Sequence, residues 1–417
     1  MTVELDIQKN VYGGDGLGRL GDGRVVFVPG AFAGEKVRAE IVEQKKRYVK
    51  ARLVEVVEAS PDRIAPGPTV PGMAYADISY KGEIRLKQDQ LENFLWKVQS
   101  SLLPLDVIAA PQPLNYRNKV VYHTERRGGK WLLGYRAEQS HDVTDVTEDP
   151  LACPEINKAL PDIRAGVMAL LTRGAKAVRD SAKAAANVTI RYTPIDGVKW
   201  WLGEPPLGME LTEQTCGLHF RVPADGFYQV NPQMADKLVA TVRDAYLEGV
   251  SEAGHLLDLY CGVGVFGLCC LNGLKGFKGD NDLKGVNGLK GLKDFTARLV
   301  GIESARAAIA CAKRNAEALG VKASFFCERV GGSLGRIKVG PHHTVILDPP
   351  RGGLEPNVPG WLAKRPAPRL FYVSCDPATL TRDLTALMPT YRIEKATLFD
   401  LFPRTARFET FVQLARR

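Results

Sequence analysis

A cysteine near the C-terminus stands where a strand would meet a helix. Residues 371–384 read FYVSCDPATLTRDL, and the aromatic and β-branched residues up to Ser374 are typical of a buried strand. Asp376 suits a helix N-cap, and Pro377 suits the first helical turn. Cys375 would then sit at a helix N-terminus, whose partial positive charge favours a thiolate. A packed core thiol is the commoner fate of a free cysteine, so this position favours a nucleophile without deciding it.

A glycine-rich turn follows another candidate strand. The stretch that begins at Asp258 reads DLYCGVGVFGL, and Gly262 and Gly264 would let a ligand approach the backbone closely. Farther along, VGIES ends a second strand on Glu303, an acid that can accept hydrogen bonds from ribose hydroxyls. The glycine-rich turn and Glu303 together predict a nucleoside-containing cofactor. They do not decide between NAD and S-adenosylmethionine. Asp258 and Cys261 fit a methyltransferase better than a dehydrogenase.

A third candidate strand runs into an acid and two prolines. Residues 345–354 read VILDPPRGGL, and Asp348 would lie at the carboxyl end of the strand. In an open parallel sheet this edge is where ligands bind. The D-P-P turn could merely end a strand, but the glycine turn and the acid on neighbouring strands favour a site.

Four stretches together resemble the motifs of the RNA uracil-5 methyltransferases. They read DLYCGVGVFGL, ILDPPRGGL, YVSCDPATLTRDL and LFDLFPRTARFETFVQL. FYQVNP at 227–232 resembles the family's segment before its catalytic domain, and YRNK at 116–119 matches its RNA-facing middle domain. The N-terminal segment resembles a TRAM domain, so the resemblance runs over nearly the whole chain.

The resemblance implies a covalent mechanism. Uracil C5 is a poor nucleophile, and a thiolate that adds to C6 turns the ring into an enolate whose C5 can attack a methyl group. Cys375 matches the nucleophile of the family. Glu409, in RFETF, matches the base that removes the proton from C5 after methylation. Without the resemblance, Glu409 would read as an exposed acid near the C-terminus.

The resemblance also implies a cofactor, S-adenosylmethionine, and residues that contact it. Together with the glycine turn, the predicted cofactor residues are Gln229, Tyr260, Gly262, Gly264, Glu303 and Asp348. Tyr260 could pack on the adenosine or be an ordinary strand residue. Asp348 could orient polar groups of the substrate or the cofactor.

Three groups of basic residues are candidates for RNA contacts. In the N-terminal stretch QKKRYVKAR they are Lys45, Lys46 and Arg47. Positive charges beside a tyrosine suit phosphate contacts and base stacking, although a solvated strand pair is an equal alternative. The resemblance adds Arg117, Lys119 and Arg351, for which plain surface solvation is the alternative.

The composition describes an ordinary globular protein with a polyanionic partner. The chain has 417 residues, a net charge of +9 and a pI near 9.0, which favours nucleic acid, although charge alone is weak support. No apolar run is long enough to span a bilayer, and the N-terminus does not resemble a signal peptide. Eight cysteines without a C-x-x-C pair predict reduced thiols in the cytoplasm. We also expect a monomer.

The sequence divides into three predicted domains. Residues 1–58 alternate short apolar runs with glycine turns, which predicts a small β-barrel. Residues 59–226 predict a linker and an α+β middle domain, with a helix over 82–100 that packs on the catalytic domain. Residues 227–417 alternate strands and helices, which predicts a mostly parallel sheet. The family resemblance implies that this sheet belongs to a Rossmann-like class I methyltransferase domain. Within residues 227–417, 271–293 is so rich in glycine and lysine that we expect an insertion without a stable helix.

Two departures from the family pattern concern cofactors. Many relatives hold an iron–sulfur cluster with three closely spaced cysteines and a fourth later in the chain. Here residues 59–110 contain no cysteine, Met73 stands near one of those positions, and Cys153 remains. A four-iron cluster needs about four thiolate ligands, so we expect no cluster in this protein. Cys153 is then expected to be a packed residue. The family's acid after the third strand is also displaced, and Glu328 in FFCERV could substitute for it.

These observations predict an S-adenosylmethionine-dependent enzyme that forms 5-methyluridine in RNA. The TRAM-like segment favours 23S rRNA over tRNA, by analogy. One rival is methylation of an exocyclic base amine, which needs no cysteine. A second rival is an RNA-binding protein of this fold that has lost catalysis.

Overall fold

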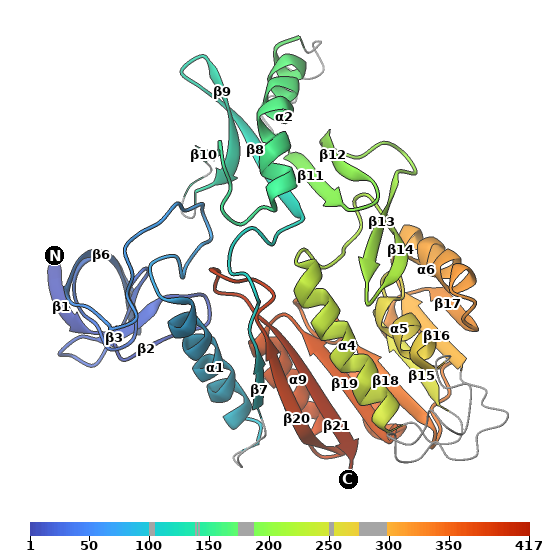
Figure 1. The fold of residues 1–417 in the computed structure, drawn as a ribbon. Helices are drawn as coiled ribbons and strands as arrows, with labels where there is room; N and C mark the ends of the chain where they lie inside the picture. Colours follow the sequence, from blue (N-terminus) through green and yellow to red (C-terminus); the bar gives the residue numbers. More distant parts are fainter. Residues whose placement is uncertain (100–104, 138–139, 141, 174–186, 250–253, 275–297) are drawn as a thin grey trace.

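The structure, a computed structural model, describes every residue except 100–104, 138–139, 141, 174–186, 250–253 and 275–297. Figure 1 shows three groups of elements: the N-terminal strands, a middle sheet with its helix, and a large C-terminal sheet flanked by helices. The C-terminal strand β21 lies inside the C-terminal sheet, and the N-terminal strand β1 lies at the far side of the N-terminal group.

The N-terminal sheet has six short strands that share one core. Its order is β1-β5-β6-β4-β3-β2, and all neighbours are antiparallel except the parallel pair β4–β6. Leu5, Val26, Val37 and Val49 come from four of these strands and are buried together. The strands are β1 (Thr2–Asp6), β2 (Lys9–Asn10), β3 (Gly16–Arg19), β4 (Val25–Val28), β5 (Lys36–Gln44) and β6 (Tyr48–Glu58).

The middle sheet has five antiparallel strands in the order β10-β9-β8-β11-β12. Helix α2 (Pro154–Arg173) packs its apolar side on this sheet, and Cys153 is buried directly before it, as expected. The strands are β8 (Lys119–Arg127), β9 (Lys130–Arg136), β10 (Val143–Asp145), β11 (Asn187–Thr193) and β12 (Gly197–Leu202). A separate hairpin of β13 (Glu210–Thr215) and β14 (Leu218–Pro223) leads toward the C-terminal sheet.

The C-terminal sheet has eight strands in the order β17-β16-β15-β18-β19-β21-β20-β7. The first five are parallel, and β21 is antiparallel to both of its neighbours. This mostly parallel sheet confirms the predicted fold class. The strands are β7 (Leu105–Ile108), β15 (His255–Leu259), β16 (Arg298–Glu303), β17 (Ala323–Cys327), β18 (His343–Leu347), β19 (Arg369–Ser374), β20 (Tyr391–Phe399) and β21 (Glu409–Arg416).

Helices cover both faces of the C-terminal sheet. One apolar core joins a face of the sheet to α4 (Pro232–Glu248), α5 (Val265–Leu274) and α6 (Arg306–Ala318). A second core joins the other face to α1 (Tyr80–Trp96), α7 (Val330–Ser333), α8 (Val358–Lys364) and α9 (Pro377–Leu387). Because both faces are buried, the carboxyl edge of the parallel strands is the part of the sheet left for a ligand.

Three elements differ from the sequence-based expectations. Helix α1 begins at Tyr80 and ends at Trp96, so it is shorter at its C-terminal end than predicted. Residues 271–274 belong to helix α5, although we expected no helix from 271 onward, and 275–293 lie outside the described residues. Strand β7, which was not predicted, adds an edge strand to the C-terminal sheet. The predicted domain boundaries stay predictions.

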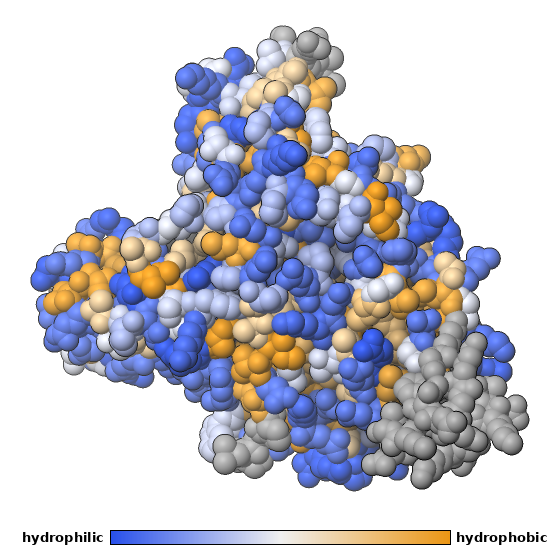
Figure 2. Space-filling model, viewed as in Figure 1, coloured by the Kyte–Doolittle hydropathy of each residue, from blue (hydrophilic) through white to orange (hydrophobic). Residues whose placement is uncertain are grey.

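The surface carries a mixture of polar and apolar residues. Figure 2 shows hydrophilic residues over much of the visible face, with hydrophobic patches on the N-terminal group and beside α1. Among the described residues, no helix is long and apolar enough to cross a membrane.

Candidate active site

Cys375 and Glu409 are brought together by two neighbouring strands. Strand β19 is antiparallel to β21, and Ser374 pairs with Thr410. Cys375 follows Ser374 and Glu409 precedes Thr410, so the same register sets them beside each other at the end of the strand pair. Cys375 is partly exposed, whereas only 3% of the Glu409 surface is exposed. Glu409 is therefore not the exposed acid that its place in the sequence would suggest without the family resemblance.

The surroundings of Cys375 oppose its ionisation in the free protein. Burial raises the pKa of the thiol to about 12, and the charges of Glu409 and Asp348 add to this shift, whereas Arg351 opposes it. Asp376 caps helix α9 as predicted and accepts hydrogen bonds from the backbone of Ala378 at 3.0 Å. Burial and the carboxylates therefore act against the thiolate that the helix N-terminus was expected to favour, and the thiolate at Cys375 stays a prediction.

Acidic side chains are concentrated at this edge of the sheet. Burial holds the pKa of Glu409 well above its usual range, and nearby Asp348 raises it further, whereas Arg351 lowers it. Burial also raises the pKa of Asp348 to about 8, with contributions from Asp258 and Glu303. Like charges near one another disfavour simultaneous ionisation, which adds to the raised pKa values of Glu409 and Asp348.

The glycine turn after β15 adopts the unusual backbone that its residues predict. Tyr260, Gly262 and Gly264 have φ angles of +66°, +53° and +86°. A Cβ on Gly262 would meet nothing within 4 Å, so this side of the turn is open to a ligand. A Cβ on Gly264 would lie 3.0 Å from Leu268, so that glycine serves the packing of α5 on the sheet.

Glu303 is bound to the glycine turn. Its Oε2 accepts a hydrogen bond from the backbone of Gly262 at 3.4 Å, and its Oε1 accepts one from Ala305 at 2.7 Å. The main-chain N–H of Asp348 donates to Leu259 at 3.3 Å, which holds the D-P-P turn against the end of β15. Glu303 and the D-P-P turn that bears Asp348 therefore both contact the end of β15 and its glycine turn.

Two further predicted residues suit a nucleoside-containing cofactor. The Oε1 atom of Gln229 is buried and lacks a hydrogen-bond partner among the described residues, so it can accept from a ligand. Tyr260 is half-buried and packs against the core beneath the D-P-P turn, and its hydroxyl accepts from Glu355 at 3.4 Å. An acid for ribose hydroxyls, an aromatic ring and a free amide oxygen fit the predicted cofactor.

Arg117 and Lys119 line a cavity of about 300 Å³ together with Phe227. Lys119 donates to the backbone of Gly226 at 3.3 Å, and burial with nearby Arg191 lowers the pKa of Lys119 to about 8. The buried Nε of Arg117 has no hydrogen-bond partner among the described residues. Arg117 and Lys119 are therefore not simply solvated surface charges, which was the alternative to an RNA contact.

Phe227 was not singled out from the sequence, yet it is the exposed aromatic of this cavity. Its surface is 75% exposed, which is unusual for phenylalanine and suits stacking on a base. Its place in FYQVNP, two residues before Gln229, was the available signal.

The remaining predicted basic residues lie at the surface. Lys45, Lys46 and Arg47 form the exposed turn between β5 and β6, where Lys45 pairs with Glu43 at 2.9 Å. Arg351 is exposed and close enough to Cys375 and Glu409 to lower the pKa of both. Only Arg351 among these four is therefore joined to the cluster around Cys375 by an observed interaction.

Met73 and Glu328, at which the sequence departs from the family pattern, both lie in the described part of the chain. Met73 accepts a hydrogen bond from the backbone of Val70 at 3.4 Å. Glu328 follows β17, forms an ion pair with Arg336, and its N–H donates to Glu303 at 2.9 Å. The absence of an iron–sulfur cluster and the role of Glu328 stay predictions.

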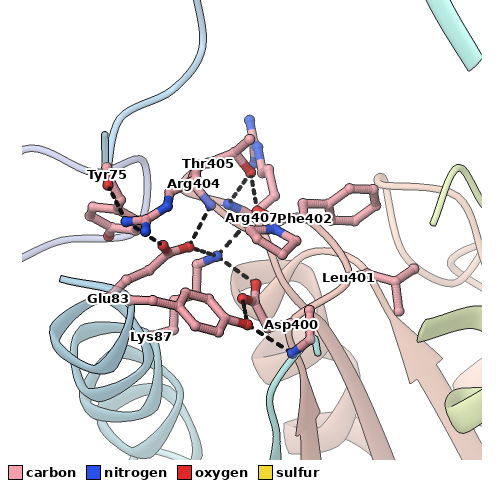
Figure 3. A network of polar contacts seen from close by, with 12 residues as sticks. Tyr75, Glu83, Lys87, Asp400, Leu401, Phe402, Arg404, Thr405 and Arg407 are labelled. Atoms are coloured by element: carbon pink, nitrogen blue, oxygen red, sulfur yellow. Dashed lines mark hydrogen bonds and ion pairs between the residues drawn. The ribbon is translucent and has the colours of Figure 1, made fainter. Parts of the chain in front are cut away.

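A buried ionic network holds the segment that leads to Glu409 (Figure 3). The Nζ of Lys87 in α1 lies 2.7 Å from both Glu83 and Asp400. Tyr80 donates to Asp400 at 2.7 Å, and the backbone of Arg404 donates to Glu83 at 2.8 Å. Burial raises the pKa of Glu83 to about 7, partly offset by Lys87. Helix α1 is thereby fixed to the loop between β20 and β21.

Comparisons with known proteins find similarity to RNA methyltransferases. Residues 296–417 match the model of the tRNA (uracil-5-)-methyltransferase family, and residues 1–54 match the TRAM domain. An uncharacterised RNA methyltransferase of Thermosynechococcus vestitus is 29% identical over 99% of this chain and 98% of its own length. A tRNA (uracil(54)-C(5))-methyltransferase of Schizosaccharomyces pombe is 27% identical over 99% of this chain and 78% of its own length.

Among solved structures, the fold is similar to that of a Pyrococcus abyssi tRNA (uracil-54, C5)-methyltransferase in complex with S-adenosyl-L-homocysteine. The TM-score is 0.72 at 22% identity, over 99% of this chain and 100% of that one. The family matches and the relatives agree on an RNA methyltransferase. The chain is therefore an RNA methyltransferase whose residues 296–417 match the tRNA (uracil-5-)-methyltransferase family and whose residues 1–54 match a TRAM domain.

Proposed function

We propose that this enzyme forms 5-methyluridine in RNA by covalent addition of Cys375 to uracil C6. The observation that carries the proposal is the strand register that sets Cys375 beside Glu409, at the edge that also bears Asp348. Covalent methylation at C5 requires a nucleophile and a base, and both lie at the carboxyl edge of the sheet, where ligands bind.

Each residue has a defined task in the reaction. The sulfur of Cys375 forms a bond to C6, and the electrons of the C5–C6 double bond move toward O4. The thiol proton leaves for Asp348 or water. S-adenosylmethionine supplies the methyl group that C5 receives. Glu409 then takes the C5 proton, the double bond re-forms, and the bond between C6 and sulfur breaks.

The charges around the site fit both stages of the reaction, the addition of Cys375 and the removal of the C5 proton by Glu409. The raised pKa of Glu409 makes its carboxylate a stronger base for the C5 proton. The raised pKa of Cys375 favours the protonated thiol in the free protein. Arg351 favours the anionic forms of both groups.

The cofactor would be held by the residues around the glycine turn. Gly262 lets it approach the backbone, Glu303 accepts from its ribose, and Tyr260 contacts its adenosine. Gln229 offers a buried Oε1 that has no partner in the described part of the chain, and Asp348 reaches the carboxyl edge at the end of β18. Gly264 contributes through the packing of α5.

The RNA would present one uridine turned out of its stack. Flipping costs a few kcal/mol, which new stacking and polar contacts offset. Phe227 offers an exposed ring, and Arg117 and Lys119 offer positive charge in the same cavity. Lys45, Lys46 and Arg47 would contact phosphates farther along the RNA, and Arg351 would act beside the reacting base.

The substrate RNA has two candidates. We predicted 23S rRNA from the TRAM-like segment alone. The relatives from Schizosaccharomyces pombe and Pyrococcus abyssi both have names that specify tRNA, and both are matched over 99% of this chain, its TRAM domain included. A TRAM domain therefore does not separate rRNA from tRNA, and the second candidate is uridine 54 of tRNA.

RNA containing 5-fluorouridine tests the mechanism, because the C5–F bond blocks the elimination and traps the adduct. We expect a covalent complex on denaturing electrophoresis with the wild type and with the control Cys327→Ala, which removes an exposed cysteine. Cys375→Ala should give none. Methylation of 23S rRNA and tRNA transcripts then separates the two substrates. Methyl transfer without an adduct would favour amine methylation, and neither product would favour a catalytically inactive protein.

A further inference from the structure

Tyr12 belongs to the N-terminal sheet, yet it touches the backbone of Cys375. It lies in the turn between β2 and β3. Its hydroxyl donates to the carbonyl oxygen of Cys375 at 3.0 Å and accepts a hydrogen bond from the Nη1 of Arg407 at 2.9 Å. Arg407 lies on the segment that leads to Glu409, so one hydroxyl joins the nucleophile's strand end to the base's strand end.

The ring of Tyr12 is fixed on three sides. It packs edge-on against Phe408, with ring centroids 5.5 Å apart, and against Phe94 of α1 at 6.3 Å. The guanidinium of Arg407 lies 5.1 Å from the centre of the same ring. The direction of the hydroxyl is therefore set by packing as well as by its two hydrogen bonds.

The turn that carries Tyr12 is itself held in place. The side chain of Asn10 donates to Gly14 at 3.0 Å and to Ala31 at 2.9 Å, and it accepts from Ala33 at 2.9 Å. Gly14 has a φ of +100°, and a Cβ on it would lie 2.7 Å from the Cβ of Ala74. The turn is pressed against the chain before α1, so Tyr12 has a rigid support.

The direction of the Cys375 carbonyl affects where the Cys375 side chain points. Helix α9 begins after it, because the first intrahelical bond runs from Leu380 to the carbonyl of the N-cap Asp376 at 3.0 Å. The Cys375 carbonyl lies outside the helical ladder, and Tyr12 is the donor observed for it. This bond fixes the peptide plane after Cys375 and thereby the direction in which its side chain leaves the backbone.

We propose that Tyr12 is a positioning residue that aims the sulfur of Cys375, so that the N-terminal sheet completes the active site in addition to any contact it makes with RNA. The inference rests on the proposed role of Cys375 as the nucleophile. It predicts that loss of one hydroxyl in the N-terminal sheet slows the formation of the sulfur–carbon bond. A residue that only stabilised the fold or the RNA complex would leave that step unchanged at saturating RNA.

The test compares Tyr12→Phe with wild type in the rate of adduct formation on 5-fluorouridine RNA, at saturating RNA and S-adenosylmethionine. The substitution keeps the ring and its packing and removes the hydroxyl. We expect the rate to fall by about tenfold or more, because a displacement of about 1 Å near reacting atoms can cost about a hundredfold. The dissociation constants for RNA and S-adenosylhomocysteine, and the unfolding midpoint, should stay near their wild-type values.

Tyr246→Phe is the matched control. The Tyr246 hydroxyl also donates to a backbone carbonyl, that of Gly254 at 3.2 Å, and the residue lies on the buried side of α4. Its loss should leave the adduct rate unchanged. Arg407→Gln provides a second variant: combined with Tyr12→Phe it should add little to the single loss, because both act through one hydroxyl.

The outcomes separate this inference from the proposed function. If the wild type forms no adduct, the role of Cys375 fails and the inference fails with it. If the wild type forms the adduct and Tyr12→Phe matches its rate, only the inference is overturned. It is also overturned if the Tyr12→Phe rate falls only in proportion to lost folding or RNA binding, or if Tyr246→Phe is equally slow.

Discussion

Lys87 in α1 and Asp400 after β20 form an ion pair at 2.7 Å, and neither side chain has any exposed surface. Glu83 completes the network on the opposite side of the ammonium, also at 2.7 Å. Buried charges persist only when each is compensated, and here they tie an early helix to the loop before Glu409. The position of the proposed base therefore depends on a residue far away in the sequence.

Lys87→Met should destabilise the protein by about 3–5 kcal/mol, because it leaves two carboxylates without their cation in the interior. Denaturant unfolding measures this change. The control is Lys36→Met, which breaks the exposed 3.3 Å pair with Glu58 and should leave the stability nearly unchanged. Equal effects of the two substitutions would contradict the importance of the buried network.

Glu409→Gln should stop the reaction after methyl transfer, because an amide cannot take the C5 proton. We expect turnover to fall by about a hundredfold or more, while a methylated covalent complex accumulates on ordinary uridine RNA. Denaturing electrophoresis with a radiolabelled methyl donor detects it. Glu394→Gln, at an exposed acid on β20 that pairs with Arg392 at 2.9 Å, serves as the control. Normal release of product by Glu409→Gln would assign the base elsewhere.

Adduct formation should accelerate with rising pH. The pKa of Cys375 is raised to about 12 by burial, Glu409 and Asp348, so the reactive thiolate is the minor form across the neutral range. Below that pKa the thiolate fraction grows about tenfold for each pH unit. Rates measured on 5-fluorouridine RNA between about pH 6 and pH 9 should rise throughout. A plateau near neutrality would mean that the bound state lowers the thiol pKa by several units.

Glu303→Ala should weaken the binding of S-adenosylhomocysteine by about tenfold to a hundredfold, because a charged hydrogen-bond acceptor is worth about 1.5–3 kcal/mol. Isothermal titration calorimetry on the RNA-free protein measures this loss. Glu317→Ala removes an exposed acid from α6 and should bind as the wild type does. Unchanged affinity in Glu303→Ala would remove this acid from the cofactor site.

The free protein should lose stability as the pH rises through neutrality. Burial raises the pKa of Asp258 to about 7, above its value in an unfolded chain, so the folded state favours the protonated form. The stabilisation is complete at low pH and is lost as the pH passes about 7. Unfolding free energies at about pH 5.5 and pH 8 should show this decline, and Asp258→Asn should reduce it. A stability that rises over this interval would contradict the assignment.

Local sequence patterns could predict the strands that lead to Cys375, Asp348 and Glu303. Each is a short apolar run that ends in a polar residue, and parallel strands bring such ends to one edge. Strand β7 could not be predicted, because its four residues, LDVI, are too short to carry a pattern and join an edge made by β20.

Properties that depend on distant partners could not be predicted either. The high pKa of Cys375 comes from burial, from Glu409 on β21 and from Asp348 directly after β18, all of them distant in the sequence or set by packing. Glu83 and Lys87 have the spacing of an ordinary surface pair on a helix, and only Asp400 and the packing of α1 make them a buried network. Tyr12 in a glycine-rich turn likewise gave no signal of its contact with Cys375.

The most direct test of the central claim is to identify the residue that carries the adduct. Wild-type protein trapped on 5-fluorouridine RNA in the presence of S-adenosylmethionine can be digested and sequenced by mass spectrometry. We predict the nucleotide on the sulfur of Cys375, in the peptide that joins β19 to α9. An adduct on another residue, or its full retention in Cys375→Ala, would contradict the proposed mechanism.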